Sequence, residues 1–279
     1  MSERSELPLG QSLRLTMIHA AAGCLVLAFC LATSPVLAAD VSAKQVTELL
    51  FRHGAGAGSI DLRAKDLSFL DLAGLDFKAA QLQDSNLYGS DLTAASLKGA
   101  NLEGAKLDRA VVARTDFSGA NLKGATLLSV TAHATLEPNA ADAPKFENAD
   151  LTGAHIAARL DGANFRNANL SGARLGQLIA TWGSWRPRAI LNGADFSGAK
   201  LGKADLSKAV LQFTRFVGAD LSGANLANCD LTKADLSSAN FTGADISGAD
   251  FDGAILTGAT GLDTAAGLSA AKNLDKALR

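Results

Sequence analysis

The sequence predicts an all-β fold in which the chain winds into a four-sided parallel β-helix, and two observations lead to this prediction. A five-residue pattern of alanine, aspartate or asparagine, leucine or phenylalanine, and two small or polar residues recurs through most of the chain. The pattern also keeps its register over long runs, as in Ala219–Leu226. A period of five fits neither an α-helix nor a plain strand, whose side chains repeat every 3.6 and 2 residues. It fits a square coil with one repeat on each side, and fixed-period self-similarity takes precedence over local propensity.

The large apolar residue at the centre of each repeat should point into the coil. These centres run from Leu62 to Leu127, from Phe146 to Leu175 and from Leu191 to Leu256. One residue is dropped between Ile156 and Leu160. The centres make about 35 sides, or nearly nine coils, and predict a rod roughly 40 Å long at the usual spacing of neighbouring strands.

The other positions of the repeat have distinct expected roles. Two residues before the centre lies a small residue, usually alanine as in Ala204, and alternation of large and small groups would fill a narrow shaft densely. Glycine is frequent two residues after the centre, as in Gly198, because a tight corner needs a positive φ. Residues twenty apart should stack in one interior column. Two such sets contain phenylalanine: Phe196 with Phe216, and Phe77 with Leu97 and Phe117.

These repeats resemble those of the pentapeptide-repeat family, and the resemblance covers nearly the whole span from Leu62 to Leu256. It implies a right-handed quadrilateral parallel β-helix, in which the handedness comes from the resemblance alone. A disordered chain rich in alanine, glycine and aspartate is the alternative, but disordered chains lack periodic large apolar groups. We therefore predict a repeat region over residues 59–261.

Short helices are predicted at both ends of the repeat region. Asp40–Phe51 has apolar residues on one side and is followed by a glycine-rich linker that ends at residue 58. Thr264–Leu278, within residues 262–279, has leucine and alanine at helical spacing. Each helix would cover an open end of the shaft and stop end-to-end addition of strands. The resemblance also implies a homodimer through the C-terminal helix as an alternative to capping.

Residues 1–39 have the features of a signal peptide. Two arginines precede an uncharged apolar stretch, Leu15–Ala39, in which a proline lies shortly before small residues. We expect cleavage after Ala38 or Ala39, and a periplasmic or secreted protein without a membrane span after cleavage. The alternative is an uncleaved anchor in the inner membrane, because the stretch is long enough to cross a bilayer.

Charge and cysteine content restrict the function further. The net charge is −2, and removal of residues 1–39 leaves it unchanged, so no strongly basic or acidic field is expected and nucleic acid is not an expected partner. Cys229 alone would remain after cleavage, in the small inward position, where a structural role is expected. The aspartates before the centres are expected to be solvated residues of the outer faces, although stacked pairs such as Asp230 and Asp250 could hold a cation.

The repeat has two breaks, near residues 128–145 and 176–190, where insertions are predicted. The first contains His133, Glu137 and Asp142, which could form a metal site or an acid–base pair. Their spacing matches no metal motif, so a surface loop is expected. No catalytic residue, metal ion or cofactor is predicted anywhere in the chain.

The second break is the candidate partner-binding loop. It holds both tryptophans of the protein and two arginines within a few residues. Aromatic rings stack on planar ligands and arginine grips carboxylates and phosphates, and loops on a rigid scaffold commonly carry binding residues. The alternative is that the tryptophans pack on the shaft and anchor the loop. The candidate residues are Trp182, Trp185, Arg186 and Arg188.

Three functions remain open at this point. The sequence favours an exported, non-enzymatic scaffold that mediates protein–protein or envelope interactions. Some members of the pentapeptide-repeat family, which this chain resembles, protect a DNA topoisomerase by DNA mimicry. The signal-like segment and the balanced charge speak against that role here. An exported carbohydrate-binding or carbohydrate-active protein is the third hypothesis, and the absence of a recognisable acidic cluster speaks against it.

Overall fold

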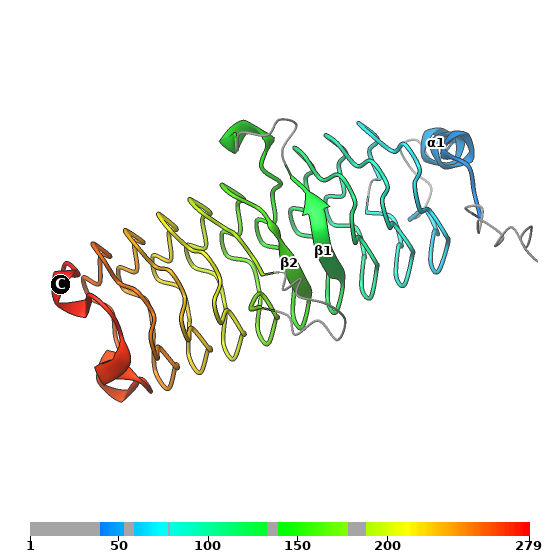
Figure 1. Ribbon diagram of the computed structural model, residues 1–279. Coiled ribbons are helices and arrows are strands. Elements are labelled where there is room, and N and C mark those ends of the chain that lie inside the picture. The colour runs from blue at the N-terminus through cyan, green and yellow to red at the C-terminus, as the bar shows by residue number, and fades with distance from the viewer. Residues whose placement is uncertain (1–39, 53–58, 78, 133–138, 178–187) are drawn as a thin grey trace, which may run out of the picture. The chain divides into compact units, whose positions relative to one another are not determined.

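A computed structural model gives the structure of the chain, and helix α1 (Ala43–Arg52) is followed in it by a stack of coils (Figure 1). The described residues are 40–52, 59–77, 79–132, 139–177 and 188–279, and they belong to one unit, Ala39–Arg279. None of the helices in this part of the chain is long and apolar enough to cross a membrane. The other elements are strands β1 (Thr126–Thr131) and β2 (His155–Arg159) and the 3-10 helices η1 (Ala140–Asp142), η2 (Leu262–Thr264), η3 (Leu268–Ala270) and η4 (Leu274–Lys276).

Parallel pairing between residues one coil apart builds four ladders, so each coil has four sides. We number the sides by the residues that begin them in the first coil: Asp61 for side 1, Asp66 for side 2, Asp71 for side 3 and Asp76 for side 4. The ladder of side 1 passes through ten coils in the described residues, against the nearly nine that the sequence predicts. Its members are Asp61, Gln81, Asn101, Asn121, Asp150, Asn169, Lys200, Asp220, Asn240 and Thr260.

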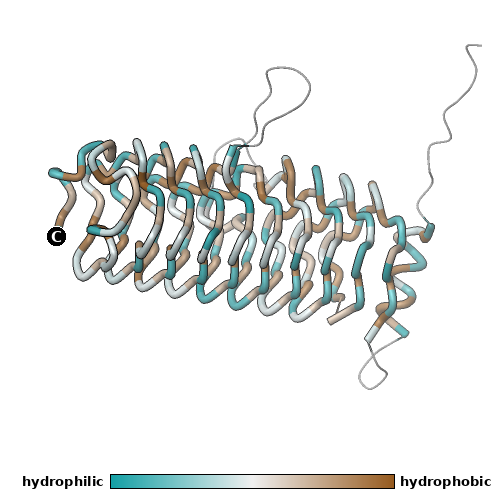
Figure 2. Tube along the Cα trace, turned by 90° about the horizontal axis from the view of Figure 1, so that it is seen from below, coloured by the Kyte–Doolittle hydropathy of each residue, from teal (hydrophilic) through white to brown (hydrophobic). Residues whose placement is uncertain are grey.

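The interior is filled as the repeat predicts. The central leucines and phenylalanines are almost all completely buried, and the alanines two positions before them are buried with them. Figure 2 shows hydrophobic and hydrophilic residues alternating around the coils at the same places. The predicted column of Phe196 and Phe216 is confirmed, with ring centroids 4.9 Å apart.

The two predicted phenylalanine sets form a single column on side 4. Phe117, Phe146 and Phe165 continue it, with nearly parallel rings and centroids 5.0 and 4.7 Å apart, and Phe165 stacks on Phe196 at 4.7 Å. The column therefore crosses both insertions without a gap. Sequence spacing alone could not join the two sets, because the insertions displace the numbering.

Helix α1 lies close to the predicted range of Asp40–Phe51. Ser42 and Gln45 form a capping box at its start: the Ser42 N–H donates to Gln45 Oε1 at 2.7 Å, and the Gln45 N–H donates to Ser42 Oγ at 3.3 Å. Val46 and Leu50 are buried in the same apolar core as the first coils. The helix thus contributes its apolar face to the core of the repeat region.

The corners combine a left-handed residue with a side-chain hydrogen bond. Two residues after the centre, φ is positive not only at glycine but also at residues such as Lys203 (φ 57°). The aspartate or asparagine before the centre accepts the N–H two residues further on, as Asp116 Oδ1 does from Ser118 at 3.0 Å. The expectation that these aspartates are simply solvated was incomplete, because many are half-buried and most cap a turn.

Asparagine alternates with aspartate along the ladders for a physical reason. Asn225 Nδ2 donates to Asp205 Oδ1 at 3.1 Å, and Asn240 Nδ2 donates to Asp220 Oδ1 at 3.2 Å. An asparagine placed one coil away from an aspartate therefore replaces like-charge repulsion with a hydrogen bond.

The breaks in the repeat lie at corners. β1 pairs in parallel with β2, and Thr131 still pairs with Val111, so the first insertion begins only after β1. The dropped residue falls in β2, where the chain is extended. A register shift between Leu128 and Thr131 of β1 compensates for the missing residue.

The single helix predicted over Thr264–Leu278 is wrong. The segment forms a further coil, in which η2, η3 and η4 alternate with residues of the ladders. In that coil Ala266 pairs with Asp245, Lys272 with Asp250 and Leu278 with Ile255. Because no long helix forms there, the dimer through a C-terminal helix that the resemblance implied has lost its structural basis.

The last coil differs from the others because its sides have six residues. These sides are residues 260–265, 266–271 and 272–277, and the second residue of each is left-handed: Gly261, Gly267 and Asn273. A 3-10 turn follows it and accommodates the extra position. Leucine and alanine then recur every three residues. That spacing also satisfies a helical pattern, which explains the incorrect prediction.

We expect Phe165→Ala to lower the free energy of unfolding by about 3–5 kcal/mol, because it leaves a cavity in the middle of the stacked column. Phe165 is completely buried and has a ring on each side of it. Phe213→Ala is the matched control: Phe213 is 55% exposed, and its loss should change stability by less than about 0.5 kcal/mol. Urea unfolding followed by circular dichroism measures both, and equal losses would show that the column does not stabilise the fold.

Stability should also decrease in acid because the turn-capping aspartates ionise more readily in the fold. For Asp150, burial would raise the pKa, but hydrogen bonds from Thr152 and the charge of Lys123 lower it below its usual value. The stabilisation is complete above the unfolded pKa of about 3.9 and is lost as pH falls through the lower folded pKa. The same direction holds for Asp66, Asp116, Asp195, Asp230 and Asp245.

Urea midpoints measured as a function of pH test this expectation. The midpoint should fall steeply below about pH 4. Asp150→Asn keeps the acceptor for the Thr152 N–H but binds no proton, so its midpoint should fall less steeply than that of the natural protein. A midpoint that rises on acidification would contradict the assignment.

Candidate interaction surface

Most of the predicted partner-binding loop lies outside the described residues, namely Trp182, Trp185 and Arg186. Arg188 is described and exposed, and its positive charge contributes to lowering the pKa of Asp230. The structure therefore leaves the proposed contact of the tryptophans untested.

The two ends of this insertion are fixed to the coils. The Gln177 N–H donates to the Ser207 carbonyl at 2.9 Å, and Lys208 Nζ donates to Gln177 Oε1 at 3.0 Å. At the other end the Ala189 N–H donates to the Leu175 carbonyl at 3.1 Å. The insertion thus leaves the sixth coil at the end of side 2 and rejoins it at side 3.

The first insertion does not bring its candidate residues together in the described structure. His133 and Glu137 lie outside the described residues, whereas Asp142 is buried at the end of η1. Arg114 donates its N–H to the Asp142 carbonyl at 2.6 Å, and its Nε lies 4.0 Å from Asp142 Oδ1. Asp142 therefore fastens the loop to the third coil. No group of three or more metal-ligating acidic, histidine or cysteine side chains occurs in the described part of the chain.

An aromatic cluster of Phe69, Tyr88 and Arg109 lies on side 2 of the first three coils. The rings of Phe69 and Tyr88 meet edge to face with centroids 5.4 Å apart, and the Arg109 guanidinium lies 5.7 Å from the Tyr88 centroid. Phe69 is 71% exposed, and its backbone has a positive φ of 58°. A Cβ atom at Gly89 would lie 2.9 Å from the Phe69 ring, so the lack of a side chain there leaves room for the ring.

Side 2 also carries cations that have no acidic partner among the described residues. The ion pairs in the described residues lie on α1 and on sides 1, 3 and 4, and none involves a cation of side 2. We call Lys106, Arg109, Arg174 and Lys208 the cationic group, and all four are exposed. Lys106, Thr126, His155 and Arg174 follow one another along a single ladder.

The acids of side 2 are engaged in hydrogen bonds with the backbone and asparagine. Asp108 Oδ1 accepts the Leu128 N–H at 2.9 Å. Asp205 Oδ1 accepts the Ser207 N–H at 2.9 Å as well as Asn225 Nδ2. Their carboxylates are thus held against the coil, whereas the cations extend from it.

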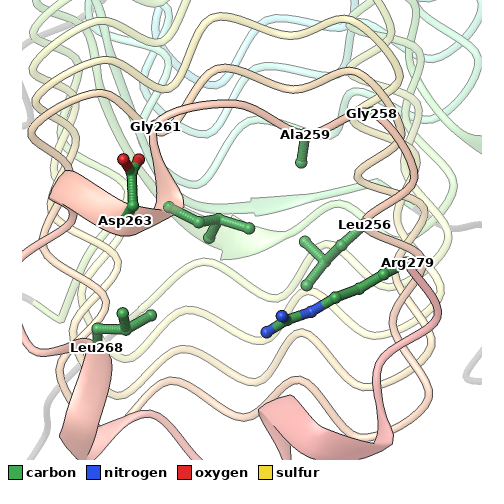
Figure 3. A pocket seen from close by; sticks show the side chains of 8 residues that line it. Leu256, Gly258, Ala259, Gly261, Asp263, Leu268 and Arg279 are labelled. Carbon is green, nitrogen blue, oxygen red and sulfur yellow. The ribbon is translucent and has the colours of Figure 1, made fainter.

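A pocket of about 470 Å³ opens at the end of the last coils (Figure 3). Its walls are largely apolar, with one acidic and one basic side chain among them. A smaller pocket of about 240 Å³ lies along α1 and is lined by Val41, Gln45, Glu48, Leu49 and Arg52. The larger one is lined by Leu256, Gly258, Ala259, Gly261, Leu262, Asp263, Leu268 and Arg279.

Comparison with known protein families identifies the fold. The family description "Pentapeptide repeats" matches eight copies in this chain, over residues 61–99, 95–127, 145–177, 189–226 and 219–258, which is more than half of its length. This chain belongs to the pentapeptide repeat family. The resemblance inferred from the repeats is therefore confirmed, and membership implies a right-handed β-helical solenoid.

A search of solved structures finds pentapeptide repeat proteins that are similar to this chain. HetL, which is involved in heterocyst differentiation regulation in the cyanobacterium Nostoc sp. strain PCC 7120, is 26% identical, with 85% of this chain and 96% of HetL covered and a TM-score of 0.44. QnrB1, a plasmid-mediated fluoroquinolone resistance protein, is 18% identical, with 72% and 84% covered and a TM-score of 0.34. A protein of the Arabidopsis thaliana thylakoid lumen is 29% identical, with 44% and 77% covered and a TM-score of 0.24. No curated protein matches this chain.

The aromatic cluster of this pentapeptide repeat protein is not among the sites predicted from the sequence. Its signal was present: Phe69 and Phe213 lie two residues after a centre, where the other repeats have glycine or a small or polar residue. Tyr88, the only tyrosine, lies one coil further on. Their contact depends on the stacking of coils and not on proximity in the sequence.

Cys229 is buried in the small inward position, as predicted. Its Sγ donates to the Leu206 carbonyl at 2.8 Å, and burial raises the pKa of the thiol well above its usual range. Both observations describe a structural cysteine and not a nucleophile.

We expect the thiol of Cys229 to resist alkylation in the folded protein. In a chain that begins at Asp40, iodoacetamide at mildly alkaline pH should leave the native protein unmodified and label it once it is unfolded by denaturant, because the thiolate does not form in the buried site. Mass spectrometry measures the labelled fraction. Rapid labelling of the native protein would place Cys229 at an accessible surface and contradict the structure.

Proposed function

We propose that this pentapeptide repeat protein is an exported, non-enzymatic scaffold that binds a protein or another component of the cell envelope. The observation that carries the proposal is the filled interior. Along the described coils the central side chains are almost all completely buried and stack on one another, so ligand-binding residues are available on the outer sides, at the insertions and at the ends of the stack, and not in its interior.

The outer sides are suited to recognition by a partner. Backbone hydrogen bonds between coils and the turn-capping aspartates hold the outward residues at fixed positions. A partner therefore meets a preorganised surface and loses little affinity to ordering of that surface.

Export is part of the proposal and is supported by the sequence of residues 1–39. The apolar stretch with small residues at Ala38 and Ala39 has the order of a signal peptide. The net charge of −2 gives no support to mimicry of DNA, which needs a strongly acidic surface.

We also infer that α1 caps the first coil. Its Val46 and Leu50 share the core with Ile60 and Leu62. Asp40 makes two hydrogen bonds to the backbone of Asp66 in the first coil: its N–H donates to the Asp66 carbonyl at 3.0 Å, and its side-chain Oδ2 accepts the Asp66 N–H at 2.9 Å. A helix in this position occupies an edge at which further strands could otherwise add.

Cell fractionation of a C-terminally tagged protein tests export. We expect it in the periplasmic or secreted fraction, with a mature N-terminus at Ala39 or Asp40 found by mass spectrometry, because signal peptidase removes the preceding residues. The matched variant carries Ala38→Leu and Ala39→Leu and is expected to block processing at either site. Full-length protein found only in the cytosol would reject export.

Chemical crosslinking in intact cells then tests the binding role. The tagged protein should yield one reproducible partner that is absent when the protein is expressed without residues 1–39. A preparation that degrades or modifies an envelope polymer with no partner bound would reject the non-enzymatic assignment.

A further inference from the structure

We infer that side 2 is the face of this protein that binds a partner, and that the partner is an acidic polypeptide. The inference rests on the proposed binding function and names the surface and the chemistry of its ligand. Two independent features of side 2 support it, the cationic group and the aromatic cluster.

On side 2 the acidic side chains form hydrogen bonds with the backbone, whereas the basic side chains have no acidic partner in the described residues. Asp108 and Asp205 accept hydrogen bonds from the N–H groups of their own corners or of the next coil. Arg174 and Lys106 occupy the same ladder position as Asp205 in their own coils but meet no carboxylate within ion-pairing distance in the described residues. On the other sides Arg63, Arg159 and Arg166 are paired with aspartates. Unpaired cations such as Lys200 and Arg215 also occur there among the described residues, so the feature particular to side 2 is that its unpaired cations lie beside the aromatic cluster.

Unpaired, exposed cations arranged along one ladder favour an anionic ligand that is extended. Thr126 and His155 separate Lys106 from Arg174 along that ladder, and no acidic residue occurs on side 2 in these two intervening coils. The positive charges are thus repeated along the rod at multiples of the strand spacing, about 4.8 Å. Complementary charges on a partner would accelerate association and fix its register.

The aromatic cluster indicates that the ligand is a protein. Exposed phenylalanine, tyrosine and arginine are the residue types enriched where protein surfaces meet. Nucleic acids and sugars are bound by open ring faces on which a base or a sugar can stack. Here Arg109 lies over the Tyr88 ring, and the edge contact with Phe69 occupies another part of it.

The surface ends next to the second insertion. Gln177, the last described residue before it, belongs to side 2 and is held by Lys208 of the cationic group. The cluster at the first coils and the cations up to the seventh coil therefore form one face, about 30 Å long at the strand spacing.

Binding of fluorescent poly-L-glutamate by the chain that begins at Asp40 tests the charge contribution. The side 2 variant carries Lys106→Gln, Arg109→Gln and Arg174→Gln. We expect its Kd at low salt to rise about tenfold, because three positive charges that would face the anionic chain are lost. Added salt should weaken binding by the natural protein.

The matched control removes the same charge from other sides. Lys145→Gln, Lys200→Gln and Arg215→Gln also change three exposed cations that form no ion pair in the described structure. This variant should bind poly-L-glutamate within about twofold of the natural protein, because the altered cations lie off the proposed face. Circular dichroism verifies that both variants are folded. Equal weakening in the two variants would overturn the assignment to side 2.

A copolymer of glutamate and tyrosine tests the aromatic contribution. The natural protein should bind it more tightly than poly-L-glutamate, and Phe69→Ala should abolish that preference. Phe213→Ala is the control, because Phe213 is also exposed and also has a positive φ of 58°, but it lies on side 3. A preference that survives Phe69→Ala would contradict the role of the cluster.

Two further outcomes decide between ligand classes and between hypotheses. If oligodeoxythymidylate or polygalacturonate at equal charge concentration displaces the copolymer more effectively than poly-L-glutamate does, the ligand is a nucleic acid or a glycan and the proposal is wrong. If side 2 binds the copolymer as expected but no partner is crosslinked outside the cytosol, the exported scaffold role fails while the binding surface stands.

Discussion

The stacking of each central side chain on its counterpart one coil away is the constraint on which the rest of the structure depends. The phenylalanine column shows its strength: Phe117 and Phe146 are separated by the first insertion, yet their rings stack at 5.0 Å. An extra residue in the paired part of a side would turn inward residues outward, just as a one-residue slip does in a sheet, and the six-residue sides of the last coil avoid this by placing the extra residue in a 3-10 turn. Long insertions are therefore confined to corners, where the chain can leave and return without moving the column.

This constraint also determines where chemistry can reside. Two of every five positions are committed to the interior, a third commonly caps the turn, and a fourth needs a positive φ. What distinguishes side 2 is the choice of residue at the last two of these positions: Lys106 and Arg174 occupy the turn-capping position, and Phe69, Arg109 and Lys208 occupy the positive-φ position. Such residues contribute little to stability, so a repeat protein can acquire a binding face without altering its core.

The interior and much of the corner geometry could be predicted from the sequence because they repeat with the period. Phe196 and Phe216 were placed in one column from spacing alone, and the left-handed corner at Gly198 followed from the same register. The last coil was missed because its period changes to six and Leu268, Ala271 and Leu274 then satisfy a helical pattern as well. The residues of the second insertion belong to no repeat, so the period carried no information on the position of Trp182 or Trp185.

The net charge was the least informative quantity, and the reason is structural. A chain with a charge of −2 seems to offer no field to a charged partner, since the acids and bases nearly cancel. On side 2, however, acidic and basic side chains have different roles. Asp205 is held by its corner, whereas Arg174, one coil before it on the same ladder, extends outward without an acidic partner in the described residues. Near-neutral composition is therefore compatible with a cationic face, because the ion pairs of the described residues lie on α1 and on the other three sides and leave the cations of side 2 without an acidic partner.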